Sequence, residues 1–207
     1  SDETDGQGRF DRYSILLAAE ICERFIETGL TVTPELKALL LARESEGDRY
    51  ANPNPSLKQH QGVFESDFNL FSWPEPCVQR LRQFCWSALG RLIQDLNGYS
   101  AEDMQRLQIF SHTWFHVTRN GGFTIMHTHP MASWSGVYCV AAGETPADRP
   151  ESGILRFHNP HHYSNYFLDP GNARLRAPYH HGTWSVRFEG GQLVLFPSWL
   201  QHEVMPF

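Results

Sequence analysis

The sequence predicts a mainly β protein with N-terminal helices, an α+β chain in which the helices pack outside a β core. Before residue 107 the apolar residues recur with the period of a helix, and after it they alternate as in strands. The segment Gln192–Phe196 is apolar almost throughout, which is typical of a strand buried between two sheets. We therefore expect a helical extension at residues 1–106 and a β core at residues 107–207, together forming one compact domain.

The composition indicates a soluble chain that can bury a core, since 41% of its 207 residues are hydrophobic. The net charge is −6 and the 17 basic residues form no run, which gives no indication of nucleic-acid binding. No apolar run reaches membrane-spanning length, and no signal peptide opens the chain. The four cysteines form no disulfide framework, which favours a reducing compartment. We expect a cytoplasmic protein without nucleic-acid or membrane partners, and the sequence leaves its oligomeric state open.

Three helices are expected in the N-terminal half. Arg12–Thr28 carries apolar residues at helical spacing and is followed by a glycine. A second helix, Pro34–Arg43, begins with Thr33 as a capping hydroxyl before a first-turn proline. Pro74–Asn97 has the most continuous apolar stripe, and we expect it to pack against a sheet rather than to bind a cofactor or partner.

The segment Leu57–Trp73 mixes aromatic and polar residues without a clear period. Its aromatic side chains could pack on the β core, which is the favoured interpretation. Alternatively, its polar residues could border a functional site. The polar residues in question are His60, Gln61, Ser66 and Asp67.

The strands of the β core are expected to include two hairpins. Asn-Gly is the strongest short hairpin signal, and it occurs at Asn120-Gly121; Glu189–Gly191 forms a second turn. The expected strands are Gln108–Thr118, Gly122–Thr128, Ser133–Val140, Gly153–Phe157, Thr183–Phe188 and Gln192–Phe196. In the long segment between the fourth and fifth strands, we interpret the pairs His161-His162 and His180-His181 as solvated loop histidines rather than a second metal site.

The first candidate for a functional site is the segment FTIMHTH. As a strand it places Phe123 and Ile125, and then His127 and His129, on one face, like a core stripe that ends in two imidazoles. Neutral imidazole suits iron, zinc, copper or nickel, although two histidines at this spacing are also common as a surface or hydrogen-bonded pair. A third histidine, His202, follows the apolar strand far downstream and favours the metal interpretation.

Three ordered segments of the C-terminal half resemble the 2-oxoglutarate/Fe(II)-dependent oxygenase superfamily: WFHVTRNGGFTIMHTHPMASWSGVYCV, SGILRFHNP and LVLFPSWLQHEVMPF. They look most like a bacterial and phage subgroup with the motifs H-x-H-P, S-G-V-Y-Y and F-P-S-x-L-x-H-x-V-x-P. The resemblance implies a double-stranded β-helix, a cupin-like jelly-roll barrel, with Fe(II) and 2-oxoglutarate as cofactors and with iron held by His127 and His202. Most members have a carboxylate two residues after the first histidine. This chain has His129 there, so we expect a three-histidine site.

Four further residues are candidates for binding 2-oxoglutarate or for lining its pocket. The superfamily usually supplies an arginine or lysine for the far carboxylate on a strand after the distal histidine, because a buried carboxylate must be paired. The printed sequence ends before such a strand, so we expect either a longer chain or Arg156 to supply this group. The alternative for Arg156 is a surface-facing arginine. Tyr138, Ser135 and Trp114 are candidates for the pocket lining.

Two classes of function remain open. The first is a 2-oxoglutarate-dependent oxygenase that hydroxylates a small-molecule or peptide substrate, whose identity the sequence does not give. The second is a cupin-like metal-binding protein that is non-catalytic or independent of 2-oxoglutarate, which the three neutral histidines favour. Release of succinate from 2-oxoglutarate in the presence of Fe(II) and oxygen distinguishes the two.

Overall fold

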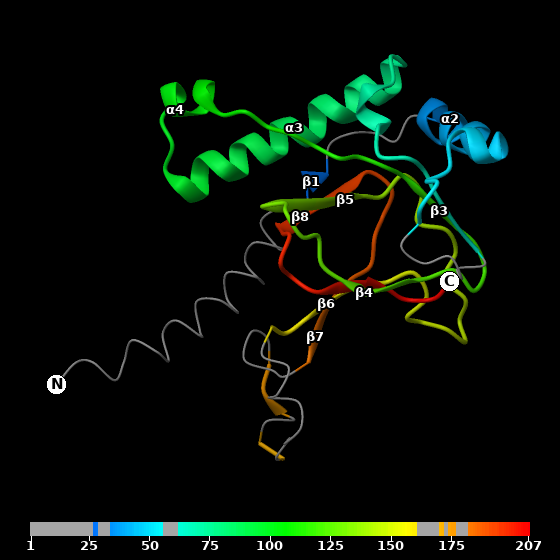
Figure 1. Ribbon diagram of the computed structural model, residues 1–207. Coiled ribbons are helices and arrows are strands. Elements are labelled where there is room, and N and C mark those ends of the chain that lie inside the picture. The colour runs from blue at the N-terminus through cyan, green and yellow to red at the C-terminus, as the bar shows by residue number, and fades with distance from the viewer. Residues whose placement is uncertain (1–26, 29–33, 56–61, 161–169, 172–173, 177–181) are drawn as a thin grey trace.

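The computed structural model describes residues 27–28, 34–55, 62–160, 170–171, 174–176 and 182–207 (Figure 1). The helices are α2 (Pro34–Ser45), α3 (Pro76–Asn97) and α4 (Ala101–Arg106), with short 3-10 turns at Gly47–Arg49 and Leu70–Ser72. The strands are β1 (Glu27–Thr28), β2 (Val63–Glu65), β3 (His116–Thr118), β4 (Thr124–His127), β5 (Trp134–Tyr138), β6 (Leu155–His158), β7 (Thr183–Val186), β8 (Gln192–Pro197) and β9 (His202–Val204).

The two larger sheets face each other across an apolar core. One has the strand order β1-β8-β5 and the other β4-β9-β6-β7, while β2 and β3 form a separate pair. Phe157 of β6 and Phe196 of β8 come from opposite sheets, and their ring centroids lie 4.9 Å apart. The expected mainly β architecture with a sheet-on-sheet core is therefore present. The described strands do not close into a barrel, so the expected jelly roll is not established by this arrangement.

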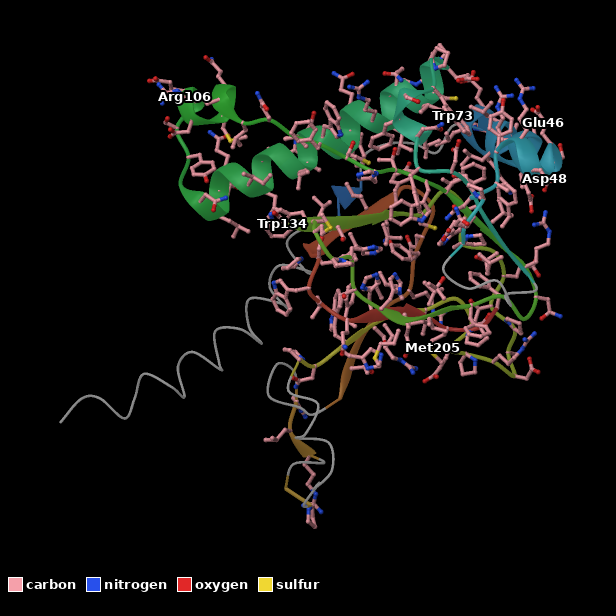
Figure 2. All side chains as sticks on the ribbon, in the orientation of Figure 1. Glu46, Asp48, Trp73, Arg106, Trp134 and Met205 are labelled. Atoms are coloured by element: carbon pink, nitrogen blue, oxygen red, sulfur yellow. The ribbon has the colours of Figure 1, made fainter. Side chains whose placement is uncertain are left out.

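Helix α3 covers the outer face of the β5–β8 sheet, as its apolar stripe predicts (Figure 1). Ala88 and Leu92 pack against Leu193 and Leu195, and in Figure 2 Trp134 lies between the helix and the end of β5. Strand β8 is thus buried on both faces, which explains why its sequence is apolar without alternation. The helix begins two residues later than expected and ends, as expected, before Gly98, which has φ +63°.

The N-terminal part agrees with the sequence in one helix and differs in another. Helix α2 begins at Pro34 as expected and continues to Ser45. Most of the helix predicted for Arg12–Thr28 lies outside the described residues, but its last two residues form β1, which pairs with β8, so that end of the prediction is wrong. The division of the chain at residues 106 and 107 stays a prediction. None of the helices in the described ranges is long and apolar enough to cross a membrane.

Between helices α2 and α3, the described residues of Leu57–Trp73 pack as the favoured interpretation expects. Leu70 and Trp73 are buried together with Phe115, and Ser66 is fully buried. Of the other three polar residues named as site candidates, Asp67 is partly buried and its carboxylate accepts from the Asn69 side chain (2.8 Å), while His60 and Gln61 lie outside the described residues.

Neither expected hairpin forms. Strand β3 pairs with β2 and β4 pairs with β9, while β7 pairs with β6 and β8 pairs with β1 and β5. The turn after β3 exists, but Gly62 occupies the space beside it. The N–H of Arg119 donates to the Gly62 carbonyl (2.7 Å), and a Cβ at Gly122 would lie 2.5 Å from that oxygen. Each turn therefore carries the chain from one sheet to another, because turn residues do not determine which strands pair.

Candidate metal centre

Three histidines from separate parts of the chain converge at one end of the inter-sheet core. Ligand-type atoms of His127, His129 and His202 all lie within 4.8 Å of one another. Their ring centroids are 4.3 Å (His127 to His202), 4.9 Å (His127 to His129) and 5.1 Å (His129 to His202) apart. Among the described residues this is the one group of three or more His, Cys, Asp or Glu side chains placed closely enough to share an ion.

The pairing of β4 with β9 brings the histidines together. His127 lies opposite His202, and Thr124 lies opposite Val204, so β4 has one residue more than β9 between these two pairs. Such a bulge breaks the strict alternation of faces. Phe123 and Ile125 are accordingly exposed, and the expected core stripe leading to the histidines is wrong. A cross-strand pair, rather than a shared apolar face, places His127 at the site.

Two of the three rings are fixed by backbone carbonyls. The Nδ1 atom of His127 lies 2.7 Å from the carbonyl oxygen of Ile125, and that of His202 lies 2.9 Å from the carbonyl oxygen of Leu200. Because a carbonyl can only accept a hydrogen bond, Nδ1 must carry the proton in each ring. The Nε2 lone pair of both histidines is therefore free to bind a metal.

Burial favours the neutral form of His202 and His129, which is the form that ligation requires. His202 is 2% exposed and contacts the rings of Phe157 and Phe196. This burial lowers the pKa of His202 to about 4, although its bond to the Leu200 carbonyl opposes the shift. Burial, together with the charges of His127 and His116, also lowers the pKa of His129. Neutral imidazoles bind a metal without first losing a proton.

One of the expected pocket residues lies beside the triad, and a second is linked to it through another residue. The ring of Trp114 has its centroid 5.6 Å from that of His129. Ser135 reaches the site indirectly, because its hydroxyl lies 2.7 Å from that of Ser198, whose carbonyl accepts a bond from the His129 N–H. Tyr138 instead packs against Phe84 of α3, with ring centroids 6.0 Å apart, on the helix-covered side of its sheet. The structure does not bring Tyr138 to the triad.

Arg156 lies on the opposite face of its sheet from His202. In the β6–β9 ladder Phe157 is opposite His202 and Arg156 is opposite Glu203, so Arg156 and His202 point to different sides. The guanidinium of Arg156 forms ion pairs with Glu151 (2.8 Å) and Glu203 (3.6 Å). Its role as the 2-oxoglutarate anchor stays a prediction, and this geometry does not favour it.

Glu65 and His116 form a polar pair near the site, and the sequence does not single out Glu65. They are opposite each other in the β2–β3 ladder, and His116 Nε2 lies 2.9 Å from Glu65 Oε2. The His116 bond is the main cause of the lowered pKa of Glu65, with a further bond from Asn52 and a smaller effect of His127. The ring of His116 lies 6.5 Å from that of Trp114, which fits the alternation of those two residues along one strand face. No pattern in the sequence points to Glu65.

Comparison with known proteins agrees with this geometry. Residues 112–207 match a family model described as "Putative 2OG-Fe(II) oxygenase", and this segment contains all three histidines. The match supports the 2-oxoglutarate/Fe(II) oxygenase superfamily for this part of the chain, without resolving a subgroup. A search of curated proteins finds no significant match. The family implies Fe(II) and 2-oxoglutarate as cofactors, and the histidine triad is positioned to bind the metal.

The donor set itself fits such an ion. Imidazole nitrogen is a common ligand of iron, and three protein ligands leave coordination positions open for other molecules. The family match and the triad together support an iron-binding oxygenase.

Proposed function

We propose that the protein is a non-haem Fe(II), 2-oxoglutarate-dependent oxygenase whose iron is held by His127, His129 and His202. The convergence of these histidines within the segment that matches the oxygenase family carries the proposal. When bound, iron and 2-oxoglutarate would activate dioxygen, which is the oxidant: one oxygen atom would enter succinate as 2-oxoglutarate loses CO₂, and the other would hydroxylate the substrate.

The chain itself orients the ligands and excludes water. The Nδ1 bonds of His127 and His202 hold their rings in one tautomer, so that Nε2 is presented without rearrangement. On one side of His202, Phe157 and Phe196 fill the space between the sheets and keep solvent away. The proposed fold is a double-stranded β-helix, and two facing sheets between which the chain crosses repeatedly support it.

We place the substrate on the side of the site that Trp114 borders. Trp114 is only partly buried, and its ring lies near those of both His129 and His116. An indole surface beside the hydrogen-bonded Glu65–His116 pair offers both apolar contact and polar groups. Such a surface suits a small-molecule or peptide substrate. We further propose a reducing, cytoplasmic environment, which the free thiols of Cys77, Cys85 and Cys139 support.

A second candidate function is a metal-binding protein that is non-catalytic or independent of 2-oxoglutarate. The observation that favours it is the absence of a carboxylate from the cluster of ligand atoms among the described residues. The net charge of a site with three neutral imidazoles is one unit more positive than that of the usual site with two histidines and a carboxylate. This difference should weaken Fe(II) binding. His129→Asp would restore the usual carboxylate, so it should raise turnover if the neutral third ligand limits the activity.

Anaerobic Fe(II) titration followed by a 2-oxoglutarate turnover assay tests the proposal. We expect one Fe(II) per chain, and release of succinate and CO₂ from 2-oxoglutarate when oxygen is admitted with a panel of small molecules and peptides. Stoichiometric iron binding without binding or turnover of 2-oxoglutarate would favour the second candidate. A purified chain that binds no iron would exclude the first candidate, and one that binds none of iron, zinc, copper and nickel would exclude both.

A further inference from the structure

We infer that Ser198 is a positioning residue of the metal centre. It holds His129 at the distance from His202 that a shared metal ion requires. This inference rests on the proposed metal-binding role of the triad and adds a residue that contacts no metal itself. Ser198 lies in the turn between β8 and β9 and is fully buried, with 0% of its surface exposed. A polar residue at such a position needs hydrogen-bond partners, and all its partners belong to segments around the triad.

Three hydrogen bonds join Ser198 to its surroundings. Its carbonyl accepts from the N–H of His129 (3.0 Å), and its own N–H donates to the carbonyl of Ser133 (3.1 Å). Its hydroxyl oxygen lies 2.7 Å from the hydroxyl oxygen of Ser135 on β5. Ser198 therefore ties the segment that carries His129 both to β5 and to the turn that leads into β9.

His129 needs such support more than the other two ligands. The rings of His127 and His202 are each bonded to the carbonyl two residues earlier, whereas the ring of His129 forms no hydrogen bond with any other described residue. Its position depends on its backbone. Pro130 restricts His129 to an extended conformation, and the bond to Ser198 fixes where that extended segment lies.

The same turn also controls His202. The N–H of Leu200 donates to the carbonyl of Pro197 (3.0 Å), and the carbonyl of Leu200 is bonded to Nδ1 of His202. A shift of the Ser198 peptide would therefore displace His129 directly and His202 through Leu200. Because metal sites require ligand positions accurate to fractions of an ångström, the expected result is weaker binding of the ion.

The hydroxyl pair gives a test that separates positioning from stability. Ser135→Ala leaves the buried Ser198 hydroxyl without its partner, and Ser198→Ala leaves the half-buried Ser135 hydroxyl without its partner, whereas the double variant removes both hydroxyls. Losing one partner of a buried hydrogen bond costs more stability than replacing both. The hydroxyl link between Ser135 of β5 and the Ser198 turn, however, is lost equally in all three variants, while the backbone bond from Ser198 to Ser133 remains.

We would measure the Fe(II) dissociation constant by anaerobic competition with a chelator, the ligand-field spectrum of the Co(II)-substituted protein, and urea unfolding of the metal-free protein. All three variants should bind Fe(II) about 10-fold more weakly, the low end of the effect of losing an outer partner of a metal site, because the hydroxyls reach His129 only through the Ser198 backbone. They should also change the Co(II) spectrum. The single variants should be less stable than the wild type, and the double variant should recover much of that stability without recovering metal affinity.

Ser66→Ala is the matched control. Ser66 is equally buried, and its hydroxyl accepts from the Phe115 N–H (3.0 Å) and donates to the Asp67 carbonyl (2.9 Å), with no bond to the histidine segments. It should lose stability and keep its Fe(II) affinity. Wild-type Fe(II) affinity in the Ser198 variants would overturn this inference but not the proposed function. So would an Fe(II) affinity that recovers together with stability in the double variant. A wild-type protein that binds no metal would overturn the proposed function as well.

Discussion

His127 and His202 lie directly opposite each other on neighbouring strands, with ring centroids 4.3 Å apart. One residue belongs to the beginning of the matched segment and the other to its end, so the metal centre joins the two ends of the β core. An ion bound between them should hold β4 and β9 together in addition to the backbone hydrogen bonds of the ladder. Metal binding and fold stability are therefore expected to be linked.

Removal of the metal should lower the stability of the protein. A ligand that binds only the folded state at 100 times its dissociation constant stabilises that state by about 2.7 kcal/mol. We expect the melting temperature to rise with Fe(II) or Co(II) under anaerobic conditions and to fall when a chelator is added. The response should be absent in His127→Ala. An equal rise in that variant would indicate that the ion binds elsewhere.

Replacement of His127 or His202 by alanine should abolish stoichiometric iron binding, because each variant leaves only two imidazoles for the ion. Metal content after anaerobic loading and gel filtration measures this. His158→Ala is the matched control: His158 is partly buried on β6, but its Nε2 lies 3.0 Å from Glu203 and its side chain points to the other face of the sheet from His202. Iron retained in the His202 variant would contradict the assignment.

Leu92→Ala should reduce the free energy of unfolding by about 2–5 kcal/mol, as for other truncations of buried leucines. Leu92 is 0% exposed and packs with Leu193 and Leu195 between α3 and the sheet. Urea unfolding measures the loss, and Leu96→Ala, at a residue that is 40% exposed, should cost much less. The Fe(II) affinity of the folded Leu92 variant should be unchanged, because the triad lies on the other side of the sheet from the helix. A large loss of affinity at unchanged stability would contradict this packing.

The sequence predicts those features that depend on local periodicity. The stripe of α3 contains Leu92 at its centre, and a single apolar face of that length can only be buried against another element. Strand β8 was recognisable from its uninterrupted apolar residues. The triad could be predicted because two histidines lie close together and His202 follows a core strand. In each case the signal is contained in a few neighbouring residues.

The features that are predicted incorrectly from the sequence depend on contacts between distant segments. The turn at Asn120-Gly121 is present, yet β2 takes the place of the expected hairpin partner of β3. The bulge in β4 that exposes Ile125 arises from pairing with β9. The face of the sheet to which Tyr138 points cannot be predicted from the sequence, because both faces of that sheet are covered. The orientation of Arg156 is easier to predict. Leu155 and Phe157 flank it in the alternating pattern of a strand, which indicates that Arg156 faces away from the core.

Acidification should remove a stabilising contribution of Glu65. The bond to His116, with a further bond from Asn52, lowers the pKa of Glu65 in the folded protein below its ordinary value of 4.5, and the charge of His127 contributes in the same direction. The unfolded chain therefore binds the proton more readily than the folded protein does. The contribution is complete above about pH 4.5 and is lost as the pH falls through the lower folded-state pKa.

Urea unfolding of the wild type and of Glu65→Gln at a series of pH values measures this contribution. The difference in the free energy of unfolding between the two proteins should shrink on acidification below about pH 4.5, the ordinary pKa of the Glu65 carboxyl group. A comparison with Glu102→Gln, which removes an exposed carboxylate paired with Arg106, shows how much an ordinary surface ion pair contributes. A difference that grows on acidification would mean that the Glu65 carboxylate is destabilising in the folded state.

Arg156→Ala should leave the binding of 2-oxoglutarate unchanged. The sequence made Arg156 a candidate for the far carboxylate of that molecule, but its guanidinium is paired with Glu151 and Glu203 on the face of the sheet opposite His202. The dissociation constant of 2-oxoglutarate for the Fe(II)-loaded protein, measured anaerobically by calorimetry or by the charge-transfer absorption of the complex, tests this. A loss of about 1.5–3 kcal/mol, the usual contribution of a hydrogen bond to a charged group, would instead show that Arg156 turns from its ion pairs toward the site when 2-oxoglutarate binds. Unchanged affinity would direct the search for the basic partner to other basic residues.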